Sequence, residues 1–442
     1  MRVLIALLLS LWTAPAWAQV PMTGAGKGTP SSGVQMVTPI FNTQNLNPSA
    51  TAANYTGLIG STWSAFTSRT APMPIAGVFS NLRVKLTVAV ASGQYVFTLY
   101  VNGAATALAC TITSSATTCT DTSTVTVAAG DVVIWQSCPG THSGVAGSCT
   151  AGTPTAQTDA ILISATFTST NIGEGFNITG TNGNNPSNSA TNYTFFGSPD
   201  VSTTWQTTEA NISGIVPTAG TIDNLYIQSS AAPGAAKSYA FTVVKNGSDT
   251  SLTCSLTGTG SGAGVTTCND TTGGHAVTVA AGDTISLKSA PSGTPTAAFI
   301  GASFRWVPTI AGEAFYSTVG VQALSTGSAR FFSAVSPIVV AGETSQAVFS
   351  YVPVALTWKK MYAAIDVAPG GSASRAWVNR VGTGTQSDGT ITCTITSAIT
   401  SCSDTSHSYS ATVGDILNWK ETPASTPAAI TLFKTSSVFA TQ

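Results

Sequence analysis

The chain has 442 residues, only 7% of which are Asp, Glu, Lys or Arg, and its formal net charge is −1. Ordinary soluble domains carry about 25% charged residues. A chain this close to neutral offers nucleic acid no electrostatic partner, so we exclude nucleic-acid binding. Hydrophobic residues make up 43% of the chain and alternate with polar ones in short runs, which argues against a disordered polypeptide.

The N-terminus has the pattern of an export signal. Met1-Arg2 is followed by an apolar run from Val3 to Trp12 and by Ala-Trp-Ala before Gln19. This pattern is typical of a cleaved secretory signal peptide. We therefore predict a signal peptide over residues 1–18, a flexible segment over 19–36, and a protein that is secreted, extracellular or held at the cell surface. A membrane anchor would need about 20 apolar residues, so no membrane insertion is expected.

One unit of sequence occurs three times. Each copy contains Cys, then Cys-x-Asp-Thr, then Gly-Asp, then Thr-Pro-x-Ala, in the same order. We take Phe41, Phe176 and Phe315 as equivalent starting points. A unit of this length can bury its own core, so the chain is predicted to use one β-rich domain three times. The expected repeats cover residues 37–168, 171–307 and 309–442.

Short alternating runs bounded by Gly, Pro, Asn and Ser predict strands of a sandwich or barrel. In the first copy the expected strands are Leu82–Val90, Tyr95–Val101, Val125–Val127, Val132–Gln136 and Ala160–Phe167. In the second they are Leu225–Gln228, Tyr239–Val244, Ala276–Val279, Thr284–Leu287 and Ala298–Phe304. In the third they are Met361–Val367, Arg375–Val378, Tyr409–Val413, Ile416–Trp419 and Ile430–Phe433. Asn-Gly pairs at Asn102 and Asn246 predict hairpins, and each Gly-Asp step predicts a tight turn between strands.

Eight cysteines in an exported chain predict disulfide bonds. The spacing from Gly-Asp to Thr-Pro is longer in the first copy, and the extra segment contains Cys138 and Cys149. An insertion that brings two cysteines most simply pairs them with each other. The other six then pair within their own repeats, as Cys110–Cys119, Cys254–Cys268 and Cys393–Cys402. We expect each of these three bonds to clamp a hairpin.

The second half of each repeat resembles the C1q/TNF-like jelly-roll family. An alternating strand, a Gly-Asp turn, an apolar strand and a last strand ending in Phe carry the resemblance, as VTVAAGDVVIW…ILISATF, VTVAAGDTISL…FIGASF and SATVGDILNW…TLFKTSSVF. The resemblance implies an all-β chain of three tandem jelly-roll-like β-sandwich domains. The family assembles as trimers around a threefold axis for adhesion or receptor binding, which implies a single-chain pseudo-trimer here. A linear row of three domains is the alternative.

Carboxylates recur at matching places in the three copies. Asp121, Asp270 and Asp404 stand in the Cys-x-Asp-Thr runs, where turn hydrogen bonding is the preferred explanation. Calcium binding is their functional alternative, because exposed loops with carboxylates suit that ion. His275 and His407 also match, but Ser123 holds that place in the first copy, so no threefold metal site is expected. We expect no cofactor.

Aromatic residues are candidates for sugar contacts. Tyr55 and Tyr193 lie in matching Asn-Tyr-Thr triplets, and Trp63 and Trp205 follow them. Exposed rings at such places can stack on sugars, although packing in the core or between domains is the preferred interpretation.

The inserted loop of the first copy is a second candidate. It contains His142 and Ser143 between its two cysteines, and the other copies lack it. Insertions of this kind map to loops on the functional face of a repeat protein, so these two residues form a candidate binding loop.

These features predict a non-enzymatic surface or fibre protein for adhesion or extracellular assembly, with no catalytic residues. Sheet edges with little charge invite strand addition, so self-association is expected. A carbohydrate- or receptor-binding protein, with a glycan or a cell-surface receptor as partner, is the first alternative. A secreted polysaccharide hydrolase that uses paired carboxylates is the second.

Overall fold

The structure is a computed structural model that describes residues 34–37, 46, 53–59, 63, 70–142, 149–150, 154, 157, 161–179, 185–196, 205–259, 264–320, 323–335 and 350–441. The expected signal peptide lies outside these residues. Within them, the regular secondary structure is almost entirely β-strand, with two single turns of 3₁₀ helix, η2 (Glu209–Asn211) and η3 (Gly273–His275). In the described part of the chain, no helix is long and apolar enough to cross a membrane.

The first module contains two main antiparallel sheets. One has the strand order β1–β12–β4–β7, with β8 also paired to β4, and the other has the order β2–β9–β5–β6, with β3 also paired to β9. A separate ribbon joins β10 to β11. The strands are β1 (Val34–Val37), β2 (Asn54–Thr56), β3 (Ala71–Pro72), β4 (Gly77–Leu86), β5 (Gln94–Val101), β6 (Ala104–Thr113), β7 (Thr118–Asp121), β8 (Val125–Val127), β9 (Val132–Pro139), β10 (Thr141–His142), β11 (Cys149–Thr150) and β12 (Ile161–Ser169).

The second module repeats this plan. Its sheets have the orders β13–β22–β16–β19, with β20 on β16, and β14–β21–β17–β18, with β15 on β21. The strands are β13 (Gly175–Thr179), β14 (Asn192–Thr194), β15 (Gly214–Ile215), β16 (Gly220–Ser229), β17 (Ser238–Lys245), β18 (Ser248–Thr257), β19 (Thr267–Asp270), β20 (Val277–Val279), β21 (Thr284–Ser292) and β22 (Ile300–Pro308).

The third module follows the same topology with one simplification. Its sheets have the orders β23–β31–β26–β29 and β24–β30–β27–β28, with β25 on β30. One long strand, β29, pairs with β26 where the first module uses two short strands, β7 and β8, to pair with β4. The strands are β23 (Glu313–Gly320), β24 (Arg330–Ser333), β25 (Ser350–Tyr351), β26 (Leu356–Ile365), β27 (Ser374–Gly382), β28 (Ser387–Thr396), β29 (Ser401–Ala411), β30 (Ile416–Ala424) and β31 (Phe433–Thr441). The predicted all-β fold of three tandem sandwich modules is confirmed.

Alternation of side chains explains how each sandwich closes. In β4, Phe79, Leu82, Val84 and Leu86 are buried, while most of the residues between them are only partly covered. Successive side chains of a strand point to opposite faces, so such a strand places one face on a core. The two sheets of each module bury these faces against each other.

A β-bulge interrupts the same strand in every module. The pairing of β4, β16 and β26 with the last strand shifts at Asn81, Asn224 and Lys360, whose φ angles are 55°, 49° and 56°. Asparagine adopts this left-handed conformation readily, whereas lysine seldom does. The bulge breaks the alternation of the sequence, which is why the first half of β4, from Gly77, is absent from the strand predicted over Leu82–Val90.

The four predicted disulfide pairs are confirmed: Cys110–Cys119, Cys138–Cys149, Cys254–Cys268 and Cys393–Cys402. The expectation that the repeated bond clamps a hairpin is wrong. Cys110 lies in β6 of one sheet and Cys119 in β7 of the other, with Cα atoms 5.7 Å apart. The same holds for β18 and β19 and for β28 and β29, so each repeated bond ties the edges of two sheets together.

The Asn-Gly and Gly-Asp motifs meet in space. Asn102 Nδ2 donates to Asp131 Oδ1 at 2.7 Å, and the Val132 N–H donates to Asn102 Oδ1 at 2.9 Å. Asn246, Asp283 and Thr284 repeat these bonds in the second module. The two predicted turns therefore support each other.

The first module begins earlier than residue 37. Strand β1 includes residues 34–36, which the sequence places in the flexible segment, and it pairs with β12. Met36 lies opposite Thr166 as Phe176 lies opposite Arg305, so Met36, and not Phe41, matches Phe176. Phe41 lies outside the described residues.

Candidate functional site

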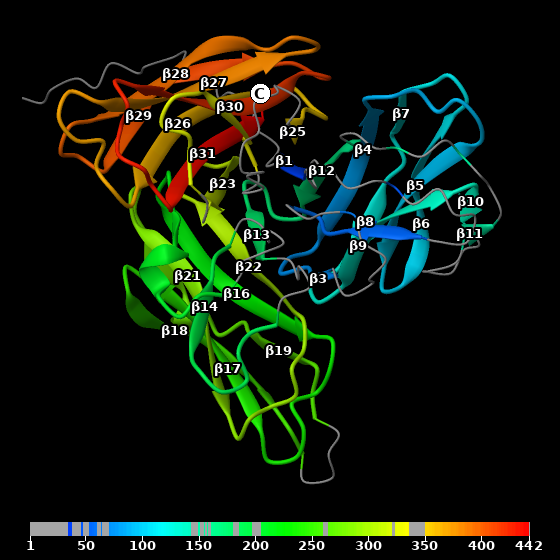
Figure 1. The fold of residues 1–442 in the computed structure, drawn as a ribbon. Coiled ribbons are helices and arrows are strands. Elements are labelled where there is room, and N and C mark those ends of the chain that lie inside the picture. The colour runs from blue at the N-terminus through cyan, green and yellow to red at the C-terminus, as the bar shows by residue number, and fades with distance from the viewer. Residues whose placement is uncertain are drawn as a thin grey trace, which may run out of the picture.

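The three modules contact one another in a ring. In each contact, a short strand of one module packs against the last strand of the next: β3 against β22, β15 against β31, and β25 against β12. We call these the first, second and third seams. The same contact repeated in one direction closes after three steps, which is a heterologous ring and not a linear row. Figure 1 shows the three sandwiches radiating from a common centre.

The first strands of the modules meet at that centre. A hollow too small to hold a water molecule is lined there by matching stretches of the three modules, residues 34–35, 173–175 and 312–314. The Gly312 N–H donates to the Gly173 carbonyl at 3.4 Å. A Cβ atom on Gly173 would lie 2.9 Å from Ala311 Cβ, so glycine permits this approach. The pseudo-threefold axis is therefore sealed.

Gln35 joins all three modules. Its Nε2 donates to the Phe176 carbonyl of the second module at 2.8 Å and to the Tyr316 hydroxyl of the third at 3.3 Å. Its Oε1 accepts the Phe176 N–H at 2.9 Å. Tyr316 is fully buried, and that burial raises its pKa above the usual value despite the bond from Gln35. A buried amide with partners on both neighbours fixes the relative position of the modules.

Aromatic contacts cross two of the seams at matching positions. Phe167 of β12 meets Phe176 edge to face, with ring centroids 4.9 Å apart, and Trp306 of β22 meets Phe315 in the same way at 4.8 Å. All four rings are buried. Such pairs add about 0.5–1.5 kcal/mol to the burial of their surfaces. The cores of neighbouring modules are thus continuous across these contacts.

A buried carboxylate also holds the second seam. Glu313 of β23 pairs with Lys359 and with Lys360, both at 2.8 Å, and it accepts the hydroxyl of Thr218 from the second module at 2.5 Å. Burial alone would raise the pKa of Glu313, but these partners outweigh it and hold the pKa below its usual value. The bulge at Lys360 places this ammonium between the two modules, since it also donates to Thr218 at 3.0 Å.

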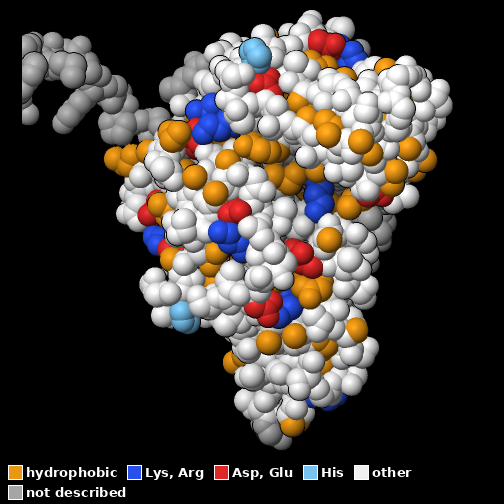
Figure 2. Space-filling model, turned by 90° about the vertical axis from the view of Figure 1, so that its left-hand side faces the viewer, with side chains coloured by type: hydrophobic (Ala, Val, Ile, Leu, Met, Phe, Trp, Pro, Cys, Tyr) orange, Lys and Arg blue, Asp and Glu red, His pale blue; other side chains and the backbone are white. Residues whose placement is uncertain are grey.

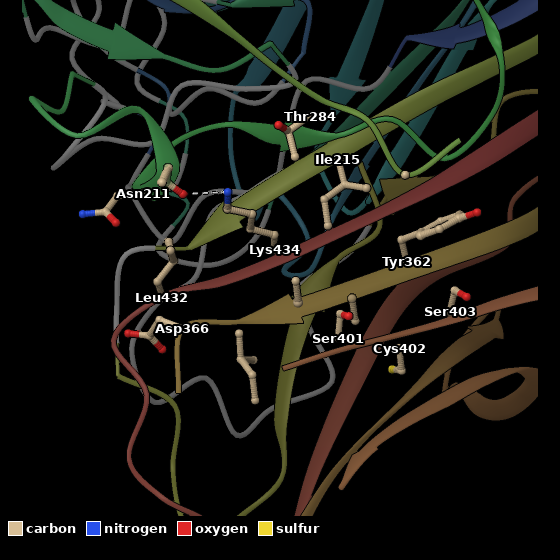
Figure 3. Close-up of a pocket in the computed structure, with 15 residues that line it drawn as sticks. Asn211, Ile215, Thr284, Tyr362, Asp366, Ser401, Cys402, Ser403, Leu432 and Lys434 are labelled. Carbon is tan, nitrogen blue, oxygen red and sulfur yellow. Dashed lines mark hydrogen bonds between the residues drawn. The ribbon is translucent and has the colours of Figure 1, made fainter. Parts of the chain in front are cut away.

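The second seam contains a cleft of about 700 Å³. Its walls come from η2, β15 and the β20–β21 turn of the second module, and from β26, β29 and β31 of the third. Figure 3 shows Tyr362 at one end of the cleft and Asn211, Leu432 and Asp366 at the other. In Figure 2, hydrophobic side chains gather in a band between the third module at the top and the second below it.

Lys434 crosses this seam. Its Nζ donates to the Ala210 carbonyl and to Ser213 Oγ, each at 2.8 Å. Its side chain is almost completely buried, and burial lowers its pKa to about 8, although the nearby Glu209 carboxylate opposes that shift. The Glu209 carboxylate itself accepts the Ser286 hydroxyl at 3.0 Å.

The three repeated aspartates hold backbone, and each ties two sheets together. Oδ2 of Asp121, Asp270 and Asp404 accepts an N–H from the strand across the sandwich edge, at 2.8–3.0 Å. Ser123, His275 and His407 give these carboxylates a further partner, so the serine takes the place of the two histidines. Among the described residues, no group of three or more His, Cys, Asp or Glu side chains could hold a metal ion.

The four aromatic candidates do not form one surface. Tyr55 and Trp63 are buried at 2% exposure, and Trp63 packs edge-on against Phe97 in the core. Tyr193 and Trp205 are partly covered; Trp205 packs against the core of the second module, and Tyr193 packs against a cluster that contains Phe195 and Ile212 of the second module and Val319 and Leu432 of the third. Core packing therefore accounts for the first two, because their rings fill space between the sheets. His142 lies in β10, and Ser143 lies outside the described residues.

The residues that join the modules had no distinct signal in the sequence. Gln35 falls before the first recognisable repeat, and Lys434 stands in an ordinary strand. Comparison of the copies could have singled out Lys434, because its matching position in β22 is Gly301.

Comparisons with known proteins identify no family. No protein-family model matches the chain, and no curated protein matches it. A chain from the atomic structure of Sulfolobus Turreted Icosahedral Virus aligns over 91% of this chain and 91% of its own, with 11% identity and a TM-score of 0.17. A similarity at that level carries no inference about fold or function, so we take the fold from the strand pairing alone.

Proposed function

We propose that this protein is an exported, non-enzymatic surface or fibre protein for adhesion or extracellular assembly. Three modules of one chain would replace the three subunits of a C1q/TNF-like trimer. The observation that carries the proposal is the ring of three matching seams around a sealed axis. A chain that contains its whole ring presents a fixed, multi-sided body to its surroundings without depending on protein concentration.

The covalent chemistry supports a role outside the cytoplasm. Four disulfides indicate an oxidising environment, where such bonds form and persist. Export through the N-terminal signal is part of the proposal. The bonds tie sheet edges in every module, which suits a body that has to survive where no chaperones act.

The repeated carboxylates favour a structural role over hydrolysis. A glycosidase needs two carboxylates that face a substrate. Asp121, Asp270 and Asp404 instead accept backbone N–H groups within their own modules. Their bonding capacity is used by the fold.

Strands at the ends of the sheets support assembly between chains. Strands β6, β18 and β28 each end a sheet, and the exposed positions of β18 are mainly Ser and Thr. Because these edge strands carry little charge, they do little to prevent a strand of another chain from pairing with them. Addition of strands at these edges would link ring to ring.

Electron microscopy and light scattering on the mature protein test the proposal. We expect a monomeric, compact particle in dilute solution and ordered polymers or a surface-bound layer at high concentration. Discrete particles under all conditions, together with no binding to cells or glycans, would contradict it. Turnover of a polysaccharide, lost in Asp404→Asn, would favour the hydrolase instead.

A further inference from the structure

The first and second seams differ at one matching position. Gly301 of β22 pairs with Gln228, and Lys434 of β31 pairs with Ala364. Each is the third residue pair beyond the bulge, so the two positions match. A Cβ atom on Gly301 would lie 2.5 Å from the Thr70 carbonyl oxygen, so the two modules touch there through backbone. In the second seam, the Lys434 side chain fills this place and reaches Ser213, which precedes β15 as Thr70 precedes β3.

The lysine therefore separates two modules that would otherwise close on each other. The cleft of about 700 Å³ lies at this place, and Lys434 forms part of its wall (Figure 3). At the first seam, Tyr226 closes onto the Gly-Asp turn of the first module, with a ring atom 3.7 Å from a Cβ built on Gly130. Tyr362 and Gly282 are the matching residues of the second seam, and both line the open cleft.

The Lys434 ammonium is available to an anion. It has two neutral acceptors, Ala210 and Ser213, and no ion pair with any carboxylate of the described residues. An ammonium has three N–H donors, so one remains for a ligand. In a chain with so few charges, a cation buried beside an open cleft without a paired carboxylate is an unusual arrangement.

The remaining walls suit a sugar. Thr284, Ser401 and Ser403 supply hydroxyl groups, Asn211 supplies an amide, and Tyr362 supplies a partly exposed ring. Sites for small polar ligands combine an apolar surface with a few fixed polar groups in a space of about this size.

We propose that the cleft of the second seam binds an acidic sugar, with Lys434 pairing with its carboxylate and Tyr362 packing against its ring. This deepens the proposed adhesive function by naming a ligand class. The sugar would bind where two modules meet, so binding would also hold the ring together.

An array of carboxylated glycans, with neutral counterparts beside them, tests this on the full mature chain. The probes are oligomers of glucuronic and galacturonic acid and sialylated oligosaccharides, each paired with its uncharged equivalent. We expect retention of at least one carboxylated probe and none of its neutral form. Lys434→Met should weaken that binding at least tenfold, whereas Lys420→Met, which removes a lysine paired with Asp388 outside the cleft, should leave it unchanged.

A second variant keeps the test decisive if Lys434→Met does not fold. Ser403 is exposed on β29, so Ser403→Trp fills the cleft without touching the ammonium, and it should also abolish binding. Silence of all carboxylated probes, or binding unchanged in Ser403→Trp, overturns the inference. If light scattering shows a compact monomer but no probe binds on the array, the acidic-sugar ligand is ruled out while the proposed structural function still stands.

Discussion

At the scale of single residues, the repeated aspartate makes several hydrogen bonds in each module. Asp404 accepts N–H groups from Thr392 at 3.0 Å, Ser406 at 3.2 Å and His407 at 3.1 Å. Thr392 belongs to β28, in the opposite sheet from Asp404. One carboxylate thus closes its own turn and fastens the neighbouring strand.

Replacing this carboxylate should destabilise the third module. Asp404→Ala leaves buried N–H groups without acceptors, and we expect the free energy of unfolding to fall by about 1–3 kcal/mol. Chemical denaturation followed by tryptophan fluorescence measures this. Asp249→Ala is the control, because Asp249 is 55% exposed and its pair with Lys288 is worth at most about 1 kcal/mol. Equal losses in both variants would show that the Asp404 bonds carry no stability.

The same aspartate predicts acid sensitivity. Burial would raise the pKa of Asp404, but the bonds from Thr392 and His407 outweigh it and lower the pKa to about 2. A lowered folded-state pKa adds stability that is complete above the usual Asp pKa and is lost as the carboxylate protonates. The melting temperature should therefore fall between about pH 4 and pH 2, and it should fall less in Asp404→Ala. An equal fall in both proteins would place the acid sensitivity elsewhere.

At the scale of strands, the repeated disulfide and the aspartate act on the same pair of edges. Cys254 and Cys268 join β18 to β19, and Asp270 accepts the Thr253 N–H across the same gap. The opposite edge of the sheet that contains β19 is β13, which packs against β23 of the third module. The covalent tie between the edges β18 and β19 therefore adds to the packing between the two sheets of the module.

Loss of this tie should loosen a whole sandwich. The double variant Cys254→Ser/Cys268→Ser should lose about 3 kcal/mol, the chain-entropy value for a loop of this size. Limited proteolysis should then cut between β18 and β19. Cys138→Ser/Cys149→Ser is the matched control, because that bond joins β9 to β11 without spanning the two main sheets. A larger loss of sandwich stability in the control would contradict this division of roles.

Strand bounds could be predicted from the sequence where buried and exposed side chains alternate. The prediction failed where a β-bulge interrupts that alternation. Val125–Val127 is β8 as predicted, and Tyr95–Val101 differs from β5 by one residue. The bulge at Asn81 concealed half of β4, since an extra residue shifts the alternation. The cysteines paired as predicted because each pair is local. Which sheets those pairs would join depends on long-range pairing, which local spacing does not encode.

The candidate site was beyond sequence reasoning for a related reason. Lys434 and Ser213 are 221 residues apart, and their contact exists only because the ring closes. Ser213 lies in no recurring motif, and the last-strand motif that contains Lys434 has other side chains, Leu162 and Gly301, at the matching positions of the other copies. The repeats indicate what the modules share, whereas the cleft arises where two of them differ.

At the scale of the whole molecule, the ring makes the three seams interdependent. Each module touches both others, so a module that loses one seam is still held by its other one. A linear row would behave differently, because loss of either contact would free a terminal module. Small-angle scattering distinguishes these arrangements through the radius of gyration.

Bulky substitutions that force one or two seams apart can distinguish a ring from a linear row. Gly301 lies against Thr70 in the first seam, and a Cβ on Gly214 would lie 2.8 Å from Ser317 Oγ in the second. Gly301→Trp or Gly214→Trp forces one seam apart, and we expect only a small rise in the radius of gyration because two seams remain. The double variant leaves one seam, and it should extend clearly.

The control wedge is Gly327→Trp, because a Cβ there would meet nothing within 4 Å. Its radius of gyration should equal that of the wild type. A full extension caused by either single wedge would rule out a ring, since only an open row can be opened by the loss of one contact. Unchanged scattering in the double variant would mean that Gly301 and Gly214 do not mark the places where the modules meet.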